Sequence, residues 1–565
     1  MKKLIALFIV SFILIQCIAV KSNKTSSVPV SDSSAPIIQK IETEKVSTKL
    51  VVGIVVDQMR YDYLIRFYAK YGKGGFKRLM QQGYNLENVH FNYIPTKTAV
   101  GHSSIYTGTT PENHGILGND WYDKYLKKSV YCVGDTKHIT IGASTGGNKS
   151  PHRLITTTIT DQLKLAQNMN GKTIGISLKD RAAILPVGHT ADAAYWYEGN
   201  SIGKFITSSY YMNALPQWVS DFNNAGITDN YLNQTWTTYL DIDTYTESLK
   251  DDNIYEGLFE GKRTPSFPYI LSELRKQNNN FDLLKEVPAG NSIVTDFSIA
   301  AIKEENLGKS EYIDFLAISY SSTDYIGHQF GPRSIELEDT YIRMDKELEK
   351  LLNFLDVEVG INNYTVFLTA DHAVVDVPAY LESLNIPAGY FNYSEFRKYV
   401  NDLTSKYFNS RELIENISNE QLYLNKEKLN SLNLDYDVVT RVLADELLHH
   451  KSVYKTFTAL TLQTTQFIGG IQQSIQKGYN QKYSGDILLV LNPSTISRSR
   501  TTGTTHGSGY AYDTHVPLLF YGNGIHRGTS NKYYPIVDII PTISSLLKIS
   551  NPEGCTGKPI IEALK

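Results

Sequence analysis

The chain has 565 residues, a formal net charge of −3, and 41% hydrophobic and 20% charged residues. This composition is that of an ordinary soluble protein, and it excludes intrinsic disorder, a collagen repeat and a multi-span membrane protein. The charge excludes a global basic field, so we expect no nucleic-acid partner. Three cysteines are too few for a disulfide scaffold or a cysteine-rich zinc module.

The first residues have the pattern of an export signal. Two lysines precede an apolar run over 4–15, and small residues allow cleavage after Ala19. The run is too short to span a bilayer comfortably. We therefore predict a signal peptide over 1–19, a linker over 20–48, and a periplasmic or secreted protein.

Cys17 leaves a second interpretation open. Residues 14–17 match a lipoprotein box poorly, but lipidation of Cys17 would turn the serine-rich stretch that follows into a tether. The protein would then be an outer-membrane lipoprotein, and contact with a membrane is expected only in that case. After processing, Cys132 and Cys555 remain, and the sequence does not decide whether they form a disulfide.

Continuous apolar runs predict strands that are buried on both faces. Such runs occupy residues 50–56, 315–318, 365–370, 486–491 and 516–521. Helical periodicity lies between them, for example over 335–355 and 436–448. Strands separated by helices predict an α/β fold, with a mainly parallel central sheet flanked by helices, over 49–565. Pro517 in the last run predicts an edge strand or an early strand position.

Two long stretches fit this alternation poorly. The segment 193–291 is rich in Tyr, Asn and Thr, and the segment 385–483 is polar and largely helical. We predict that both are insertions or caps on the central sheet.

Acidic and histidine side chains follow three of the predicted strands, and a glycine-flanked loop near the end of the chain adds one more histidine. They are Asp57, Asp324, His328, Asp371, His372 and His506. Singly, each is more commonly a helix cap, a surface pair or a solvated loop residue. Because ligands bind beyond the carboxyl ends of parallel strands, we expect the six side chains to lie together at one edge of the sheet.

Three carboxylates and three imidazoles suit Zn²⁺, and they divide into two sites of three ligands. Two metals about 4 Å apart clamp the attacking and leaving oxygens of an in-line displacement, which is phosphoryl or related ester chemistry. A nucleophilic hydroxyl is then expected in the segment 95–104, a loop that enters a short helix. The pattern by itself does not separate Thr96, Thr98 and Ser103.

These residues resemble the alkaline phosphatase superfamily. More closely, the chain is similar to the exported single-chain bacterial alkaline phosphatases that use a threonine nucleophile. The resemblance covers most of the chain from Lys49 onward and rests on several motifs together. They lie at 55–60, 95–104, 118–123, 177–181, 322–328, 370–372, 504–506 and 512–517.

The resemblance implies a role for each side chain of the predicted site. Thr98 would be the nucleophile and bridge both metals. The non-bridging phosphate oxygens would be bound by Asn119, Lys179 and Arg181. One zinc would be held by Asp324, His328 and His506, and the other by Asp57, Asp371 and His372.

The implied activity is that of a zinc-dependent phosphate monoesterase, an alkaline phosphatase with two Zn²⁺ per chain and a covalent phosphothreonine intermediate. We expect a monomer that acts on small-molecule phosphate monoesters. Lys179 and Arg181 favour monoesters, because they balance a dianion where a second ester group would need room.

Two alternatives stay open. A phosphodiesterase or nucleotide pyrophosphatase of the same superfamily would share the metals and the threonine, but it would need an apolar pocket in place of the Lys179 and Arg181 pair. A non-catalytic binding protein on this scaffold would be favoured by a lost ligand, and none is lost.

Two residues depart from the usual family pattern. Ala373 stands where glycine is common, and its methyl group would crowd the second zinc site slightly. Lys97 places a charge beside Thr98 where an apolar residue is common. Neither departure removes a predicted ligand or phosphate-binding group.

Overall fold

The computed structural model describes residues 48–200 and 202–565. The predicted signal peptide, Cys17 and nearly all of the predicted linker therefore lie outside the described residues. Within the described ranges, no helix is long and apolar enough to cross a membrane. Cys132 and Cys555 are both free cysteines.

Eleven strands of the described chain form one central sheet. Its order is β20 (Gly528–Ser530), β2 (Tyr84–His90), β19 (His515–Gly522), β12 (Tyr364–Thr369), β1 (Leu50–Val56), β11 (Asp314–Tyr320), β6 (Thr173–Ser177), β7 (Ala193–Glu198), β8 (Lys204–Ser208) and β5 (Thr140–Ile141). In addition, β21 (Tyr534–Pro535) pairs with β2.

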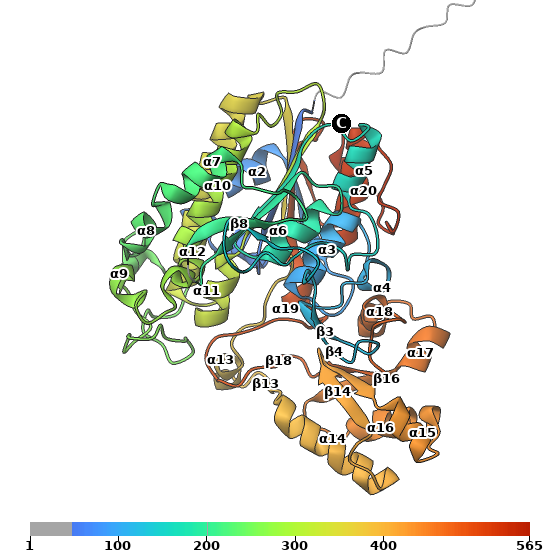
Figure 1. Ribbon diagram of the computed structural model, residues 1–565. Coiled ribbons are helices and arrows are strands. Elements are labelled where there is room, and N and C mark those ends of the chain that lie inside the picture. The colour runs from blue at the N-terminus through green and yellow to red at the C-terminus, as the bar shows by residue number, and fades with distance from the viewer. Residues whose placement is uncertain (1–47, 201) are drawn as a thin grey trace, which may run out of the picture. The chain divides into compact units, whose positions relative to one another are not determined.

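The middle of this sheet is parallel, as the sequence predicts. β1 pairs in parallel with β11 and β12, and β6 and β7 continue beyond β11. Figure 1 shows α10 (Ala289–Glu304) and α12 (Ile335–Leu355) on one side of the strands, and α3 (Thr98–Thr107) and α20 (Ile539–Leu547) on the other. Because helices cover both faces, every residue of β1 and β11 is buried.

The position of β19 in the sheet contradicts one of the two locations predicted for Pro517, the edge strand. This strand lies between β12 and β2, antiparallel to both, so Pro517 is not on an edge strand. The register with β2 shifts between Val516 and Leu518, which places the proline at a bulge. A proline is tolerated there because the bulge needs no ladder hydrogen bond from it. The predicted early position holds, since Pro517 is the third residue of β19.

The apolar run at 486–491 does not join the central sheet. It forms β17 (Ile487–Leu491), which belongs to a four-stranded antiparallel sheet with β14 (Ile414–Ser418), β15 (Gln421–Leu424) and β16 (Val453–Thr458). Ile487 and Leu489 pack into one apolar cluster, and Leu488 and Val490 pack into another. Both faces of β17 are therefore covered, which produces the same sequence pattern as a strand of a parallel sheet.

The two segments predicted as insertions differ from each other. The segment 193–291 begins with β7 and β8, which are strands of the central sheet, so that boundary is wrong. The segment 385–483 contains the helices α14 (Tyr393–Phe408) and α16 (Tyr436–Leu447) and three strands of the small sheet. Figure 1 shows these helices beside the small sheet, in the orange part of the chain.

Candidate active site

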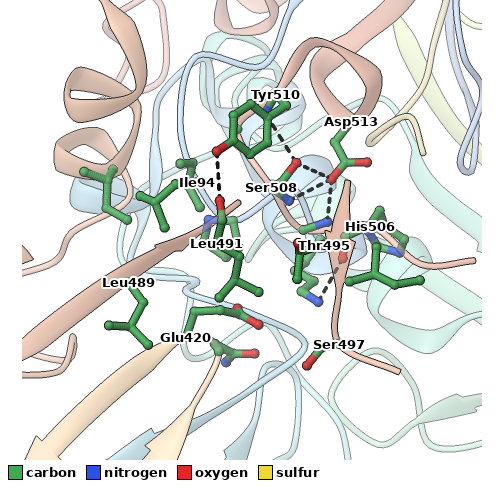
Figure 2. Close-up of a pocket in the computed structure, with 18 of the residues that line it drawn as sticks. Ile94, Glu420, Leu489, Leu491, Thr495, Ser497, His506, Ser508, Tyr510 and Asp513 are labelled. Carbon is green, nitrogen blue, oxygen red and sulfur yellow. Dashed lines mark hydrogen bonds between the residues drawn. The ribbon is translucent and has the colours of Figure 1, made fainter. Parts of the chain in front are cut away.

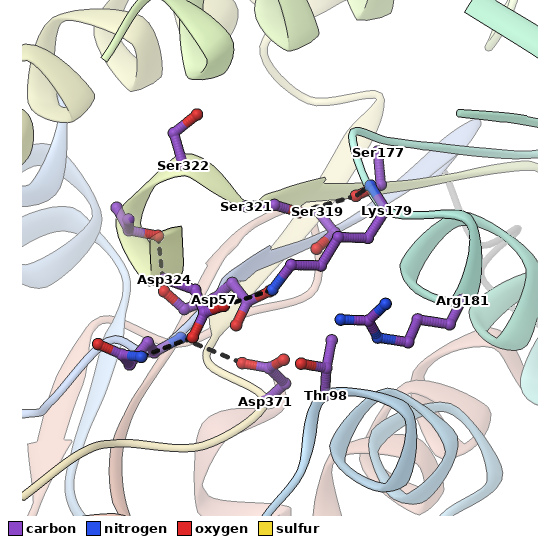
Figure 3. Close-up of polar contacts among 12 residues, drawn as sticks. Asp57, Thr98, Ser177, Lys179, Arg181, Ser319, Ser321, Ser322, Asp324 and Asp371 are labelled. Carbon is purple, nitrogen blue, oxygen red and sulfur yellow. Dashed lines mark hydrogen bonds and ion pairs between the residues drawn. The ribbon is translucent and has the colours of Figure 1, made fainter. Parts of the chain in front are cut away.

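Three neighbouring strands of the central sheet end beside the predicted acidic residues. Asp57 follows β1 directly, Asp371 and His372 follow β12, and Asp324 lies in the first turn of α11 (Ser322–Phe330), which follows β11. The in-register pairing of β1 with β11 and β12 places these ends side by side. All four side chains are buried. Figure 3 shows the carboxylates of the three aspartates converging on one region.

These side chains form two groups that have the spacing of metal ligands. In each group, one ligand atom from every residue lies within 4.8 Å of the others. The first group is Asp57, Asp371 and His372, and the second is Asp324, His372 and His506. The predicted set for the second site contained His328 instead of His372.

His328 nevertheless lies against Asp324. Its Nε2 is 3.1 Å from Asp324 Oδ1, and the Nε2 of His506 is 3.7 Å from the same oxygen. The rings of His372 and His506 are stacked, with their centroids 3.4 Å apart. All six predicted metal-ligating residues are therefore brought together.

The three histidines share one hydrogen-bonding arrangement. Nδ1 of His328 lies 2.7 Å from the carbonyl oxygen of Thr504, and Nδ1 of His506 lies 2.7 Å from that of Thr96. Nδ1 of His372 lies 3.1 Å from the carbonyl oxygen of Ala373. A carbonyl oxygen only accepts, so each Nδ1 carries the proton and each Nε2 lone pair is left for a metal.

Several atoms at this edge have no hydrogen-bond partner in the part of the chain that the structure describes. They are Asp57 Oδ1, Asp371 Oδ2 and His372 Nε2, and all are buried. Buried polar atoms in folded proteins are almost always hydrogen-bonded, so these three need another partner. Carboxylate oxygen and imidazole nitrogen are the donors that Zn²⁺ takes in proteins, and this donor set fits such an ion.

Burial and neighbouring carboxylates shift the protonation of the same groups. Burial, together with the Asp324 charge, raises the pKa of Asp57 to about 6. Burial and the Asp57 charge raise the pKa of Asp371 well above its usual value. Burial holds the pKa values of His372 and His506 well below the usual value, so both imidazoles are neutral, as metal ligation requires.

Lys179 places an ammonium group between the two ligand groups. It is the residue immediately before α6 (Asp180–Val187), and its Nζ lies 2.6 Å from Asp57 Oδ2 and 2.6 Å from Asp324 Oδ2. Burial alone would lower the pKa of Lys179, but Asp324 and Asp57 outweigh it and raise the pKa. Lys179 is therefore a buried side chain that is charged at neutral pH.

Arg181 is the second cation of the site, and its side chain is half-buried. One terminal nitrogen donates to the hydroxyl of Tyr131 over 3.2 Å, and its Nε has no partner within the described residues. Figure 3 shows the guanidinium group reaching toward Thr98 and Asp371. Since guanidinium donors match phosphate oxygens well, this arrangement leaves Arg181 available to an anion.

Thr98 is the first residue of α3, where the helix dipole is positive. Its side chain is buried, and Figure 3 shows it beside the carboxylate of Asp371. Asn119 is tied to the same helix, because its Oδ1 accepts a hydrogen bond of 2.9 Å from the backbone N–H of Ala99. Both Asn119 and Thr98 therefore lie at the start of α3.

The other two hydroxyls of the segment are placed differently. Thr96 donates its hydroxyl proton to the carbonyl oxygen of Ser508 over 2.8 Å. Ser103 lies farther along α3 and is fully buried. Figure 3 shows the Thr98 side chain beside Asp371, whereas Thr96 contacts the predicted ligand His506 through its backbone carbonyl oxygen.

The two residues that depart from the family pattern also have defined contacts. Lys97 Nζ donates to the carbonyl oxygen of His506 over 3.2 Å, so this charge points toward the histidine loop. The backbone N–H of Ala373 donates to the carbonyl oxygen of Asp513 over 2.8 Å. Ala373 itself is buried in the main core.

Gln58 is a contact residue of the site that the sequence analysis did not single out. Its side-chain amide donates to Asp324 Oδ1 over 2.5 Å, and its backbone N–H donates to Asp371 Oδ1 over 3.2 Å. Its φ of +66° is rare for a residue other than glycine. The sequence feature that could have pointed to Gln58 is its position directly after Asp57, at the end of a buried strand.

The fold and this geometry agree with the comparison to known proteins. A sequence model of the type I phosphodiesterase / nucleotide pyrophosphatase family matches residues 51–512. The chain belongs to this family, which lies in the alkaline phosphatase superfamily that the motifs predicted.

Curated relatives add detail. Alkaline phosphatase PafA from Elizabethkingia meningoseptica is 44% identical over 519 residues, which are 91% of this chain and 94% of PafA. Alkaline phosphatase PhoV from Synechococcus elongatus is 45% identical over 520 residues, covering 92% and 93% of the two chains. A crystal structure of PafA matches with a TM-score of 0.88 and 44% identity, covering 92% of this chain and 99% of PafA. The predicted fold class is confirmed.

Proposed function

We propose that this protein is an exported, zinc-dependent phosphate monoesterase that acts through a covalent phosphothreonine at Thr98. The observation that carries the proposal is the pair of overlapping ligand groups, whose buried atoms lack hydrogen-bond partners in the described chain, beside Thr98, the buried Lys179 and the half-buried Arg181. Alkaline phosphatases that are 44% and 45% identical over almost the whole chain support the same activity.

The metals would be held by the six predicted ligands, which include His328 beside Asp324. Asp57, Asp371 and His372 would hold one zinc, and Asp324, His328 and His506 the other, with Thr98 between them. When bound, zinc supplies Lewis-acid chemistry to the oxygens of the phosphate ester. The buried, neutral imidazoles and the unpartnered carboxylate oxygens support this assignment.

Thr98 would carry the covalent step. Its Oγ gives up its proton and forms a bond to phosphorus in line with the scissile bond. The bond from phosphorus to the alcohol oxygen breaks, and that oxygen takes up a proton as the alcohol leaves. Water then cleaves the phosphothreonine and releases phosphate. The position of Thr98 at the positive end of α3 favours the negative charge that develops on its Oγ.

The phosphate-binding side chains would set the preference for monoesters. Asn119 uses Oδ1 to hold the backbone at Ala99, which leaves its Nδ2 to donate to a phosphate oxygen. Lys179 and Arg181 add two positive charges, which a dianionic monoester balances better than a monoanionic diester. A phosphodiesterase is the second candidate, since the family that the chain belongs to includes phosphodiesterases.

One experiment separates these candidates. Zinc-loaded protein would be assayed on p-nitrophenyl phosphate and on bis-p-nitrophenyl phosphate, and the two kcat/KM values compared. A large preference for the monoester is expected. A preference for the diester would give the assignment to the phosphodiesterase, and bound zinc without turnover on either would favour a non-catalytic binding protein.

The proposed export depends on the first residues of the chain. Cleavage after Ala19 predicts a mature protein that begins at residue 20 and is periplasmic or secreted. Mass spectrometry of the purified mature protein tests this. A start at Cys17 with a lipid mass would instead identify a membrane-anchored lipoprotein.

A further inference from the structure

A cavity lies next to the proposed active site, between the small sheet and the loops that contain Ile94 and His506. Its walls come from the turn between β14 and β15, from the end of β17, from β18 (Thr495–Ile496) and from the loop over 505–513. Figure 2 shows side chains from these segments around it. The cavity volume is about 80 Å³.

The cavity has one apolar side and one polar side. Ile94, Leu489 and Leu491 contribute aliphatic side chains, and Figure 2 shows them on one side of the cavity. Figure 2 shows His506 on the opposite side, and Lys97, which also lines the cavity, donates to the carbonyl oxygen of His506. An aliphatic wall of this kind favours an apolar group by the removal of its surface from water.

Two hydrogen bonds and one shared residue connect this cavity to the proposed active site. Lys97 precedes the proposed nucleophile and donates to the backbone of His506. His506 belongs to a metal-ligand group as well as to the cavity wall. Asn419, which also lines the cavity, donates its Nδ2 to the carbonyl oxygen of Asp120 over 2.6 Å, next to Asn119.

The turn that closes the cavity is held in one conformation. Asn419 and Glu420 both have positive φ values, +50° and +56°, as a tight turn between two antiparallel strands requires. Glu420 Oε1 accepts a hydrogen bond of 2.8 Å from the hydroxyl of Tyr393 on α14. The wall is therefore preformed, and a ligand need not order it on binding.

We propose that this cavity is the subsite for the alcohol portion of the phosphate monoester, and that it selects small aliphatic alcohols of a few carbon atoms. The inference rests on the proposed monoesterase function and deepens it. The volume is about half of the 150 Å³ of an engineered apolar cavity that binds benzene, so a short alkyl chain fits and a nucleoside does not.

The test uses methyl, ethyl, propyl and butyl phosphate, whose leaving alcohols have nearly equal acidity. Differences in kcat/KM then report contacts to the chain and not leaving-group chemistry. We expect the zinc-loaded wild-type protein to gain about threefold to fourfold per added methylene group until the cavity is full.

Two substitutions of Leu491 distinguish binding of the alkyl chain in this cavity from a general effect of mutation on kcat/KM. Leu491→Phe narrows the cavity and is expected to flatten the dependence on chain length. Leu491→Ala widens it and is expected to move the preferred chain to greater length. The matched controls are Leu460→Phe and Leu460→Ala, because Leu460 lies on α17 (Ala459–Thr464), is 47% exposed and does not line the cavity.

The outcomes are distinct. A wild-type protein that hydrolyses all four esters at equal kcat/KM, or Leu491 variants with the wild-type dependence on chain length, would overturn the subsite and leave the proposed function standing. Hydrolysis of none of these esters and of no other phosphate monoester would overturn the proposed function, and the subsite with it.

Discussion

The catalytic edge, defined as the residues that follow β1, β11 and β12, and the strand β17 are both buried, with opposite consequences for stability. At the catalytic edge, carboxylate and imidazole atoms are buried without a partner in the described chain, and this costs free energy of folding. β17 buries aliphatic side chains on both faces, which contributes free energy of folding.

This difference between the catalytic edge and the small sheet predicts which property a substitution in each region should change. At the catalytic edge, a lost side chain should reduce turnover and metal binding, and should change the free energy of unfolding through the metal. In the apolar core of the small sheet, away from the cavity that Leu491 lines, a lost side chain should reduce the free energy of unfolding and leave turnover unchanged. The predictions below test this difference, from the largest expected loss of activity to the smallest.

Removal of bound metal is expected to abolish turnover and to lower the midpoint of thermal unfolding. Asp57, Asp324 and Asp371 would lose the counter-charge that compensates their burial. At a free zinc concentration of 100 times Kd, the stabilisation from one site is about 2.7 kcal/mol. Activity, unfolding midpoint and zinc content would be followed as chelated protein is titrated with Zn²⁺, with two ions per chain expected.

The control for metal removal is Asp57→Asn, which keeps the side-chain shape and removes the charge. Its zinc-dependent rise in unfolding midpoint should be smaller than that of the wild type. Full activity in a sample that elemental analysis finds free of metal would contradict the two-metal account.

Lys179→Ala is expected to lower kcat/KM for a phosphate monoester by about 10- to 100-fold, because a charge-assisted hydrogen bond to phosphate is lost. The loss on a diester should be smaller, so the ratio of the two kcat/KM values should fall. Lys164→Ala is the matched control, since Lys164 is also buried but pairs with Asp192 outside the site. An unchanged ratio in Lys179→Ala would mean that this side chain does not contact phosphate.

Gln58→Ala is expected to weaken zinc binding by about 10-fold or more, since Gln58 orients carboxylates from both ligand groups. Two companion variants separate the side chain from the backbone. Gln58→Gly relieves the positive φ and still lacks the amide, so it should bind zinc as weakly as Gln58→Ala. Gln58→Glu keeps the length and adds a fourth carboxylate. Wild-type zinc affinity in Gln58→Ala and Gln58→Gly would show that the Gln58 side chain does not position the metal ligands.

Leu443→Ala is expected to lower the free energy of unfolding by about 2–5 kcal/mol, because Leu443 on α16 is fully buried in the cluster that also contains Leu489. Turnover well below the unfolding midpoint should stay at the wild-type value. Leu448→Ala, at the exposed end of the same helix, is the control and should change little. A large loss of turnover in folded Leu443→Ala would contradict the prediction that the core of the small sheet affects stability and not turnover.

Much of the catalytic edge could be predicted from the sequence, for a physical reason. A buried parallel strand must be apolar throughout, so the polar residue that follows it marks the end of the strand, and such ends meet at one edge. Asp57 and Asp371 stand out in this way. The prediction that Asp324, His328 and His506 join them also holds in space.

The small sheet could not be placed by the same reasoning. The strand β17 has the local pattern of a central strand, and only long-range pairing with β15 and β16 reveals that it belongs elsewhere. Gln58 was passed over because its role depends on a backbone conformation that no residue type signals. The cavity beside His506 is assembled partly from segments that are far apart in the chain, such as Ile94, the turn at Asn419 and the 505–513 loop, so it has no signature in the sequence.

The central claim is that Thr98 carries the covalent step. The most direct test is the turnover of Thr98→Ala on p-nitrophenyl phosphate at full zinc occupancy. Thr98→Ser is the matched variant, because it keeps a hydroxyl group. The account predicts a loss of about 10³-fold or more in Thr98→Ala and substantial activity in Thr98→Ser. Turnover of Thr98→Ala within a few fold of the wild type would contradict it.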